Sequence, residues 1–144
     1  MLLDNRDLPI VDMDFMNEVH YEDIKIINDL FEKLLNYELN KNEINENILN
    51  SACKHWFEHT VEHFKGEETM MLEKQFPPYQ MHKNEHDNAL KLMQDKFNLW
   101  KQTKDINILK IYLIQEVPVW FKNHISSMDK ITASFFKTGA MVCH

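Results

Sequence analysis

Residues 82–100, which read HKNEHDNALKLMQDKFNLW, decide the fold. Apolar residues recur here every three or four positions, and on a helix this spacing places them along one face. These residues are Leu90, Met93, Phe97 and Trp100. His82 and His86, four residues apart, lie in line with them. The stretch therefore predicts a helix from about Gln80 to Lys101 whose core-facing side carries two imidazoles.

Three other stretches show the same helical period. They run from about Phe15 to Tyr37, from Glu43 to Lys74 and from Asp105 to Phe136. We expect their inward residues to be Ile24, Ile27, Phe31 and Leu34 in the first stretch, Ile44, Ile48, Ala52 and Trp56 in the second, and Leu109, Leu113, Val117, Trp120 and Ile131 in the third.

A few residues mark helix ends and irregularities. Asn42 or Asn45 is a candidate N-cap for the second helix, and Pro77-Pro78 should separate it from the third. Pro118 lies inside the last helical stretch, so we expect a kink there or two shorter helices. Gly66 lies inside the second helix, where it should cost ~1 kcal/mol relative to alanine unless close helix packing requires it.

Four helices with short connections predict an all-α protein, an up-down-up-down antiparallel four-helix bundle. The chain has two glycines and four prolines in 144 residues, too few for a many-stranded β fold with frequent turns. We expect residues 1–144 to form a single domain, with an N-terminal arm at 1–14 and the bundle at about 15–136. The residues after Gly139 should fray.

Composition narrows the range of partners. The formal net charge of −7 disfavours nucleic acid and anionic membrane. No run approaches the roughly 20 apolar residues of a membrane span. Cys53 and Cys143 form neither a disulfide framework nor a metal-binding pair, and the first seven residues carry charges where a signal peptide needs an apolar stretch. The sequence therefore predicts a cytoplasmic protein.

Potential metal ligands occupy the predicted core face of every helix. They are His20, His63, Glu67, His82, His86, His124 and Asp129. His63 and Glu67 are four residues apart and share one helix face. Asp129 follows His124 by five residues, about 140° around an ideal helix, and its flexible arm should still reach the same site.

Metal coordination accounts for these polar groups on apolar faces. A buried carboxylate without a partner costs several kcal/mol. Imidazole with carboxylate suits iron, manganese or zinc, and seven ligands exceed what one tetrahedral zinc takes. Two metal ions bridged by carboxylates fit the set. A single buried histidine usually forms only a hydrogen bond. Here each of the four predicted helices carries potential ligands on its core face, and such a repeated arrangement is hard to attribute to chance.

The same residues resemble the hemerythrin family, and most closely its single-domain bacterial members, the bacteriohemerythrins. The matching segments are His20, HFKGEE at 63–68, HKNEH at 82–86 and WFKNHISSMD at 120–129. Their order and spacing cover the chain from residue 15 to about 135.

The resemblance implies a non-heme diiron centre that binds dioxygen. One iron would take His82, His86 and His124, and the other only His20 and His63. Glu67 and Asp129 would bridge them, together with an oxo or hydroxo group. Dioxygen would bind at the open position of the second iron, in an apolar pocket lined by Phe64, Trp120, Phe121 and Ile125. Trp120 and Phe121 are also the kind of large aromatic residue that simply fills a helical core.

Two residues depart from the family pattern. Asp23 stands three residues after His20, where the family usually has an apolar residue. The simplest interpretation is that Asp23 points to solvent or pairs with a lysine. Alternatively it supports a ligand or is itself an iron ligand, which would fill the open position. His59, one turn before His63, replaces a usual aromatic residue and should form a hydrogen bond within the core, unless it replaces or supplements a ligand.

The leading hypothesis is a non-enzymatic protein that binds dioxygen reversibly for storage, delivery or sensing, with a separate protein partner if it delivers or senses. A second hypothesis is a diiron enzyme acting on peroxide, nitric oxide or dioxygen. His82 to His86 also fits the H-x-x-E-H signature of some zinc proteases, with Glu85 as general base. A metal-free structural bundle is the remaining alternative.

Overall fold

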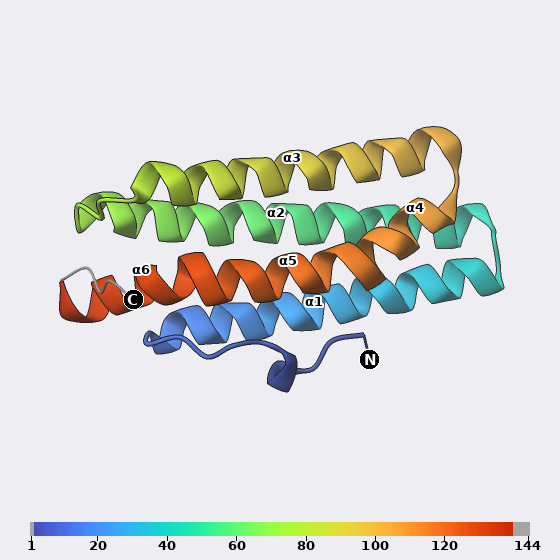
Figure 1. Ribbon diagram of the computed structural model, residues 1–144. Coiled ribbons are helices and arrows are strands. Elements are labelled where there is room, and N and C mark those ends of the chain that lie inside the picture. Colours follow the sequence, from blue (N-terminus) through green and yellow to red (C-terminus); the bar gives the residue numbers. More distant parts are fainter. Residues whose placement is uncertain (1, 140–144) are drawn as a thin grey trace.

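The computed structural model describes residues 2–139, and four helical rods lie side by side in it (Figure 1). Three rods are single helices: α1 (Asp14–Leu39), α2 (Glu43–Glu73) and α3 (Tyr79–Thr103). The fourth contains α4 (Ile106–Ile111), α5 (Val117–His124) and α6 (Lys130–Thr138), joined by the π-helical segments η2 (Tyr112–Glu116) and η3 (Ile125–Asp129).

The predicted four-helix bundle is confirmed. Each rod contacts two neighbours: α1 packs against α2 and α4, and α3 packs against α2 and α4. The connections between rods are only two to five residues long, so consecutive rods are antiparallel. The helix boundaries lie within about two residues of those predicted from the apolar period.

Local chemistry fixes the helix ends. The Asn42 side chain accepts a hydrogen bond of 2.8 Å from the Asn45 backbone N–H, which makes Asn42 the N-cap of α2. Pro77-Pro78 lies in the break between α2 and α3, as predicted. Lys104 ends α3 in the left-handed region, at φ 57°.

The fourth rod accommodates Pro118 through a π-turn. Proline lacks the backbone N–H of a helix interior, and its ring clashes with the carbonyl four residues earlier. The structure places η2 directly before α5, so the Val117 N–H bonds to the Tyr112 carbonyl, five residues back, and Pro118 lies in the first turn of α5. The helical path continues, with α4 inclined to α5 (Figure 1). The predicted irregularity is therefore a bend at a π segment.

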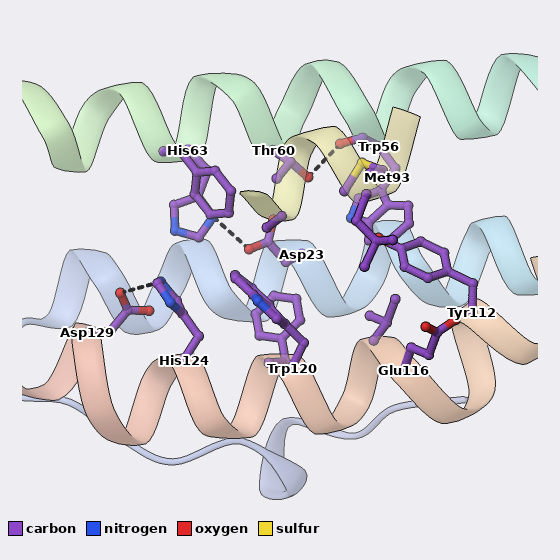
Figure 2. A pocket seen from close by; sticks show the side chains of 15 residues that line it. Asp23, Trp56, Thr60, His63, Met93, Tyr112, Glu116, Trp120, His124 and Asp129 are labelled. Atoms are coloured by element: carbon purple, nitrogen blue, oxygen red, sulfur yellow. Dashed lines mark hydrogen bonds and ion pairs between the residues drawn. The ribbon is translucent and has the colours of Figure 1, made fainter. Parts of the chain in front are cut away.

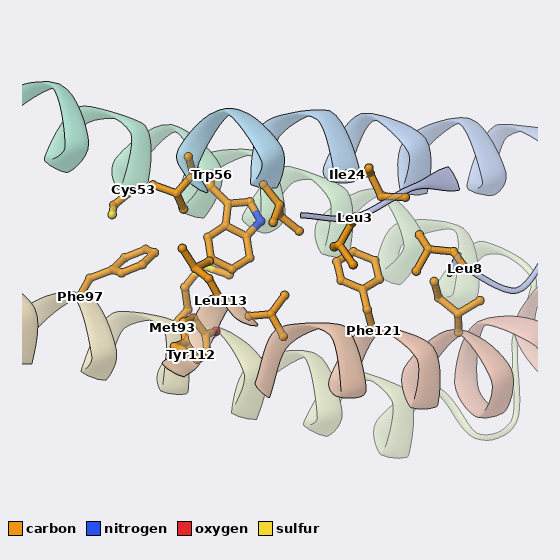
Figure 3. Close-up of a cluster of buried hydrophobic side chains, with 14 of the residues drawn as sticks. Leu3, Leu8, Ile24, Cys53, Trp56, Met93, Phe97, Tyr112, Leu113 and Phe121 are labelled. Atoms are coloured by element: carbon orange, nitrogen blue, oxygen red, sulfur yellow. The ribbon is translucent and has the colours of Figure 1, made fainter. Parts of the chain in front are cut away.

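The core face of α2 differs from the prediction. Ile44 is 71% exposed and Ile48 is 44% exposed, so both are wrongly predicted as core residues. The buried row is instead Leu49, Cys53, Trp56, Thr60, Phe64, Glu67 and Met71. Figure 3 shows the part of the core where Cys53 and Trp56 lie close to Phe97 and Tyr112.

The N-terminal arm, predicted only as a segment without helical period, is part of the core. It runs along α1 (Figure 1) and buries Leu3, Leu8 and Val11. Two side-chain amides of α1 hold it. Asn28 exchanges two hydrogen bonds of 2.8 Å with the Leu3 backbone, and Asn17 exchanges two of 2.9 Å with Val11. A short 3₁₀ turn, Asn5–Asp7, lies between the two attachment points.

The last described residue, Gly139, ends the fourth rod. Gly139 follows α6 in the left-handed region at φ 72°, and the predicted fraying beyond it, with Cys143, falls outside the described residues. No helix between residues 2 and 139 combines the length and the apolar character needed to cross a membrane.

Gly66 is not explained by close packing. It is exposed, and a Cβ added there would meet no atom within 4 Å. Gly66→Ala is therefore expected to raise the free energy of unfolding by ~1 kcal/mol, because alanine loses less backbone entropy in a helix. Urea unfolding of the metal-free protein measures this. Gly139→Ala is the matched control with the opposite sign, since a left-handed alanine costs roughly 1–2 kcal/mol. A destabilised Gly66→Ala protein would contradict the open surroundings at this position.

Candidate metal centre

The seven candidate ligands converge at one level of the bundle. His20 comes from α1, His63 and Glu67 from α2, His82 and His86 from α3, His124 from α5 and Asp129 from η3. Each of these side chains is at most 5% exposed. Five imidazoles and two carboxylates therefore share a space that water barely reaches.

The π segment η3 brings Asp129 to the site. On an ideal α-helix, a residue five positions after His124 would be about 140° away. Residues Ile125–Asp129 form a π-helical turn, whose hydrogen bonds join residues five apart, so the two side chains return to the same face. Asp129 Oδ1 lies 3.1 Å from His124 Nε2 (Figure 2). The π-turn, more than the flexibility of the aspartate side chain, therefore overcomes the 140° separation expected from the sequence.

The polar atoms form two groups. In the first, one atom from each of Glu67, His82, His86, His124 and Asp129 lies within 4.8 Å of all the others. The second consists of His20, His63 and Glu67, by the same measure.

Both carboxylates contact the two groups. Asp129 Oδ1 lies 3.2 Å from His82 Nε2, and its Oδ2 lies 3.0 Å from His20 Nε2. Glu67 Oε1 lies 3.5 Å from His63 Nε2 and 3.3 Å from His86 Nε2. Each carboxylate thus lies between three histidines on one side and two on the other.

In the three-histidine group, the outer ring nitrogens are held by side chains to which the sequence analysis gave no such role. His82 Nδ1 is 2.8 Å from Thr132 Oγ1. His86 Nδ1 is 2.9 Å from Glu68 Oε2, and His124 Nδ1 is 2.6 Å from Glu85 Oε1. These contacts orient Nε2 of each ring inward, as outer partners of metal-binding histidines do. Two of these partners could have been suspected from the sequence, because each is adjacent to a candidate ligand: Glu68 follows Glu67, and Glu85 precedes His86.

The residues fit cations. Buried polar atoms that lack a hydrogen-bond partner within the described chain gather here: Oε1 and Oε2 of Glu67, Oδ1 of Asp129, and Nε2 of His63 and His86. Such atoms are costly unless something satisfies them. Nitrogen and carboxylate donors suit iron, manganese or zinc, and two positions with shared carboxylates accommodate two ions.

The charges within the site are strongly coupled. Desolvation alone would lower the pKa of His124, but Asp129 and Glu85 outweigh it and raise that pKa to about 9. Desolvation would raise the pKa of Asp129, yet His124, His20 and His82 hold it well below its ordinary value. The metal-free protein therefore holds ionised pairs here, and a metal that binds the imidazoles must displace protons.

A cavity of about 50 Å³ opens at the ligand site, where His63 of the two-histidine group and His124 and Asp129 of the other group line it (Figure 2). Phe64, Trp120 and Phe121 line it, whereas Ile125 is fully buried and is not among the lining residues. Phe64 stacks on the His86 ring with centroids 3.8 Å apart, and Trp120 stacks on His124 at 4.5 Å. The two aromatic rings therefore cover ligand imidazoles and also form the cavity wall.

Asp23 also lines this cavity and is only 2% exposed, so the interpretation that it points to solvent is wrong. Its Oδ1 lies 2.8 Å from His59 Nε2, and its Oδ2 lies 2.8 Å from His63 Nδ1. Desolvation opposes ionisation of Asp23, but these two histidines lower its pKa overall. Asp23 in turn raises the pKa of His59.

The zinc-protease interpretation does not fit the geometry. It requires Glu85 to act as a free general base beside one metal held by His82 and His86. Glu85 instead contacts the outer nitrogen of His124. His82 and His86 face a shared group with Glu67 and Asp129.

Comparison with known proteins agrees with this site. Residues 14–135 match the family model described as hemerythrin HHE cation binding domain. The chain is 31% identical over 120 residues to the bacteriohemerythrin of Aquifex aeolicus (strain VF5), covering 83% of this chain and 86% of that protein. It is 34% identical over 86 residues to the bacteriohemerythrin of Ralstonia nicotianae (strain ATCC BAA-1114 / GMI1000), covering 59% of this chain and 61% of that protein. No solved structure gives a significant match. The resemblance noted in the sequence is confirmed, and the chain belongs to the hemerythrin family.

Proposed function

We propose that this protein binds dioxygen reversibly at a non-heme diiron centre, for oxygen storage, delivery or sensing. The observation that carries the proposal is the pair of unequal ligand groups, with three histidines in one and two in the other, and with Glu67 and Asp129 in contact with both. Similarity to two bacteriohemerythrins supports the choice of iron and of dioxygen.

In this proposal the ligands divide as the groups do. His82, His86 and His124 would hold one iron, and His20 and His63 would hold the other. Glu67 and Asp129, which contact histidines of both groups, would serve both ions. The position with two histidines would have fewer protein ligands, which would leave room for a small molecule.

The bound ferrous pair supplies the electrons that dioxygen accepts. The protein's own part is to keep the site dry and the ligands fixed. Phe64, Trp120 and Phe121 in the cavity wall, together with the fully buried Ile125, would limit the access of water to the metal position. The cavity of about 50 Å³ admits only a molecule of a few atoms.

Metal content measured together with the ultraviolet–visible spectrum tests this function. The expected result is two irons per chain and a visible charge-transfer band that appears when oxygen is added to the reduced protein and disappears on deoxygenation. One zinc per chain, or no metal, would refute the diiron centre. Two irons without a reversible oxygen band would refute oxygen carriage and leave the centre itself intact.

A diiron enzyme acting on peroxide, nitric oxide or dioxygen is the second candidate. The observation in its favour is Asp23, a buried carboxylate that lines the cavity but belongs to neither of the two convergent ligand groups. A carboxylate beside a reacting ligand can accept or donate a proton. Rapid turnover of peroxide or nitric oxide, with immediate oxidation of the reduced protein in air, would favour this candidate.

The cellular setting of the proposal is the cytoplasm. Cys53 is free and buried, and unpaired thiols are usual in a reducing compartment. For delivery or sensing, we propose a protein partner that receives the oxygen or the signal.

A further inference from the structure

Asp23 links two histidines of α2 to α1. It stands one turn after His20, and its two carboxylate oxygens each lie 2.8 Å from a different imidazole. One is His63 Nδ1, the outer nitrogen of a candidate ligand; Figure 2 marks this contact. The other is Nε2 of His59, whose side chain is 22% exposed. The carboxylate therefore connects a buried ligand ring to a ring that reaches the surface.

The two ligand groups differ in how their outer nitrogens are held. In the three-histidine group, every Nδ1 has a partner: Thr132, Glu68 or Glu85. In the two-histidine group, His20 Nδ1 is buried without a hydrogen-bond partner in residues 2–139. Asp23 is thus the one side chain of the described structure that contacts an outer nitrogen in that group.

Asp23 is not placed as a ligand itself. Neither of the two convergent groups includes it. Both of its oxygens are in contact with imidazole nitrogens, and the nitrogen of His63 that it contacts is the one facing away from Glu67. It therefore acts on the centre through His63.

We propose that Asp23 is a positioning residue that orients His63 and thereby keeps the two-histidine metal position occupied, with His59 holding Asp23 in place. This inference rests on the proposed diiron centre. The carboxylate lies beside Nδ1 of His63, where it favours the ring form with a proton on Nδ1, leaves the Nε2 lone pair for the metal and raises the basicity of the ligand. His59 forms an ion pair of 2.8 Å with the other oxygen of Asp23 and so balances the charge of this buried carboxylate.

Asp23→Asn tests the inference, because it keeps the shape of the side chain and removes its charge. Metal affinity is measured by dialysis of the iron-loaded protein against a competing chelator. One of the two irons is expected to bind about 10–100-fold more weakly, the usual effect of losing an outer partner, while the other is unchanged. His59→Gln should weaken the binding of the same iron by a smaller factor.

Nitrogen NMR of the metal-free protein provides a readout independent of metal. Against desolvation, Asp23 and Glu67 raise the pKa of His63 well above its ordinary value, so the spectrum is recorded at a pH high enough for the ring to be neutral. His63 should then carry its one proton on Nδ1 in the unmodified protein and lose that preference in Asp23→Asn. Asp29→Asn is the matched control. Asp29 lies on the same helix and pairs at 3.5 Å with Lys33 at the surface, so neither readout should change.

The outcomes separate this inference from the proposed function. If the unmodified protein holds two irons and Asp23→Asn holds both equally well, the positioning role is refuted and the diiron centre stands. If the unmodified protein holds no pair of metals, the proposed function fails first. If Asp23→Asn does not fold, as judged by circular dichroism, His59→Gln decides, and unchanged affinity for both irons in that variant refutes the inference.

Discussion

The Asp129→Asn protein is expected to lose both metal ions. Asp129 contacts His82 and His124 in one ligand group and His20 in the other, so a single change removes a carboxylate that both groups share. Asparagine keeps the shape but supplies no negative charge to balance two cations. Affinity at both positions should fall by more than the roughly 100-fold upper figure for losing an outer partner. Competition with a chelator during iron loading measures it.

Asp95→Asn is the control for Asp129→Asn. Asp95 lies on α3 and forms an exposed ion pair of 2.8 Å with Lys91, which is worth at most about 1 kcal/mol and is remote from the ligands. Its iron content should match that of the unmodified protein. Retention of one iron at full affinity by Asp129→Asn would show that Asp129 serves a single metal and does not bridge.

Metal removal is expected to lower the thermal unfolding midpoint by on the order of 20 °C. A ligand that binds only the folded state at a thousand times its Kd adds about 4 kcal/mol, so two such sites add about 8 kcal/mol. Roughly 2–4 °C per kcal/mol is usual for a chain of this size. The buried polar atoms left without partners around Glu67 and Asp129 explain why the metal-free core is weak. Circular dichroism during heating, with and without chelator, measures the shift.

The Asp129→Asn protein provides the control for metal removal, because chelator should barely change its unfolding midpoint. A metal-free structural bundle predicts the opposite pattern. In that case chelator would leave the unmodified protein unaffected, and replacing His82 by a small apolar residue would be tolerated or stabilising. Equal unfolding midpoints with and without chelator would therefore support the structural alternative.

The rods were predictable because their apolar period is strong and their breaks are chemically marked. Asn42 and Pro77-Pro78 mark the ends of α2 as the sequence indicated. The wrong core predictions on α2, Ile44 and Ile48, have a geometric cause. Steps of four residues advance about 40° per step on an α-helix, so a row from Ile44 to Trp56 winds about a third of the way around it. Only Trp56, at the end of that row, is buried.

The prediction that Ile131 faces the core is wrong for a different reason. It is 42% exposed, although the period before it predicts an inward position. The π segment η3 changes the residues per turn just before it, so counting at 3.6 residues per turn no longer applies. Thr132 and Ala133 are buried in its place. Nothing in the composition of Ile125–Asp129 distinguishes a π-turn from an α-turn.

The seven candidate ligands could be named from the sequence because each lies on an apolar face where a polar side chain needs a reason. The pairing of each ligand with its outer partner could not be predicted, although two of the partners stand next to a ligand in the sequence. Thr132 reaches His82 across 50 residues of sequence, and Glu85 reaches His124 across 39. Such pairs depend on how two helices are rotated against each other, which apolar periodicity fixes too coarsely to match single atoms.

The π-turn between His124 and Asp129 also changes how related sequences should be compared. A turn that closes over five residues instead of four contains one residue more than its neighbours, so it behaves as a single-residue insertion retained within a helix. What must be preserved is then the number of residues between the histidine and the aspartate, together with the apolar character of the buried Ile125. An alignment that shortens this interval by one places the aspartate on another face of the helix, however well the flanking letters match.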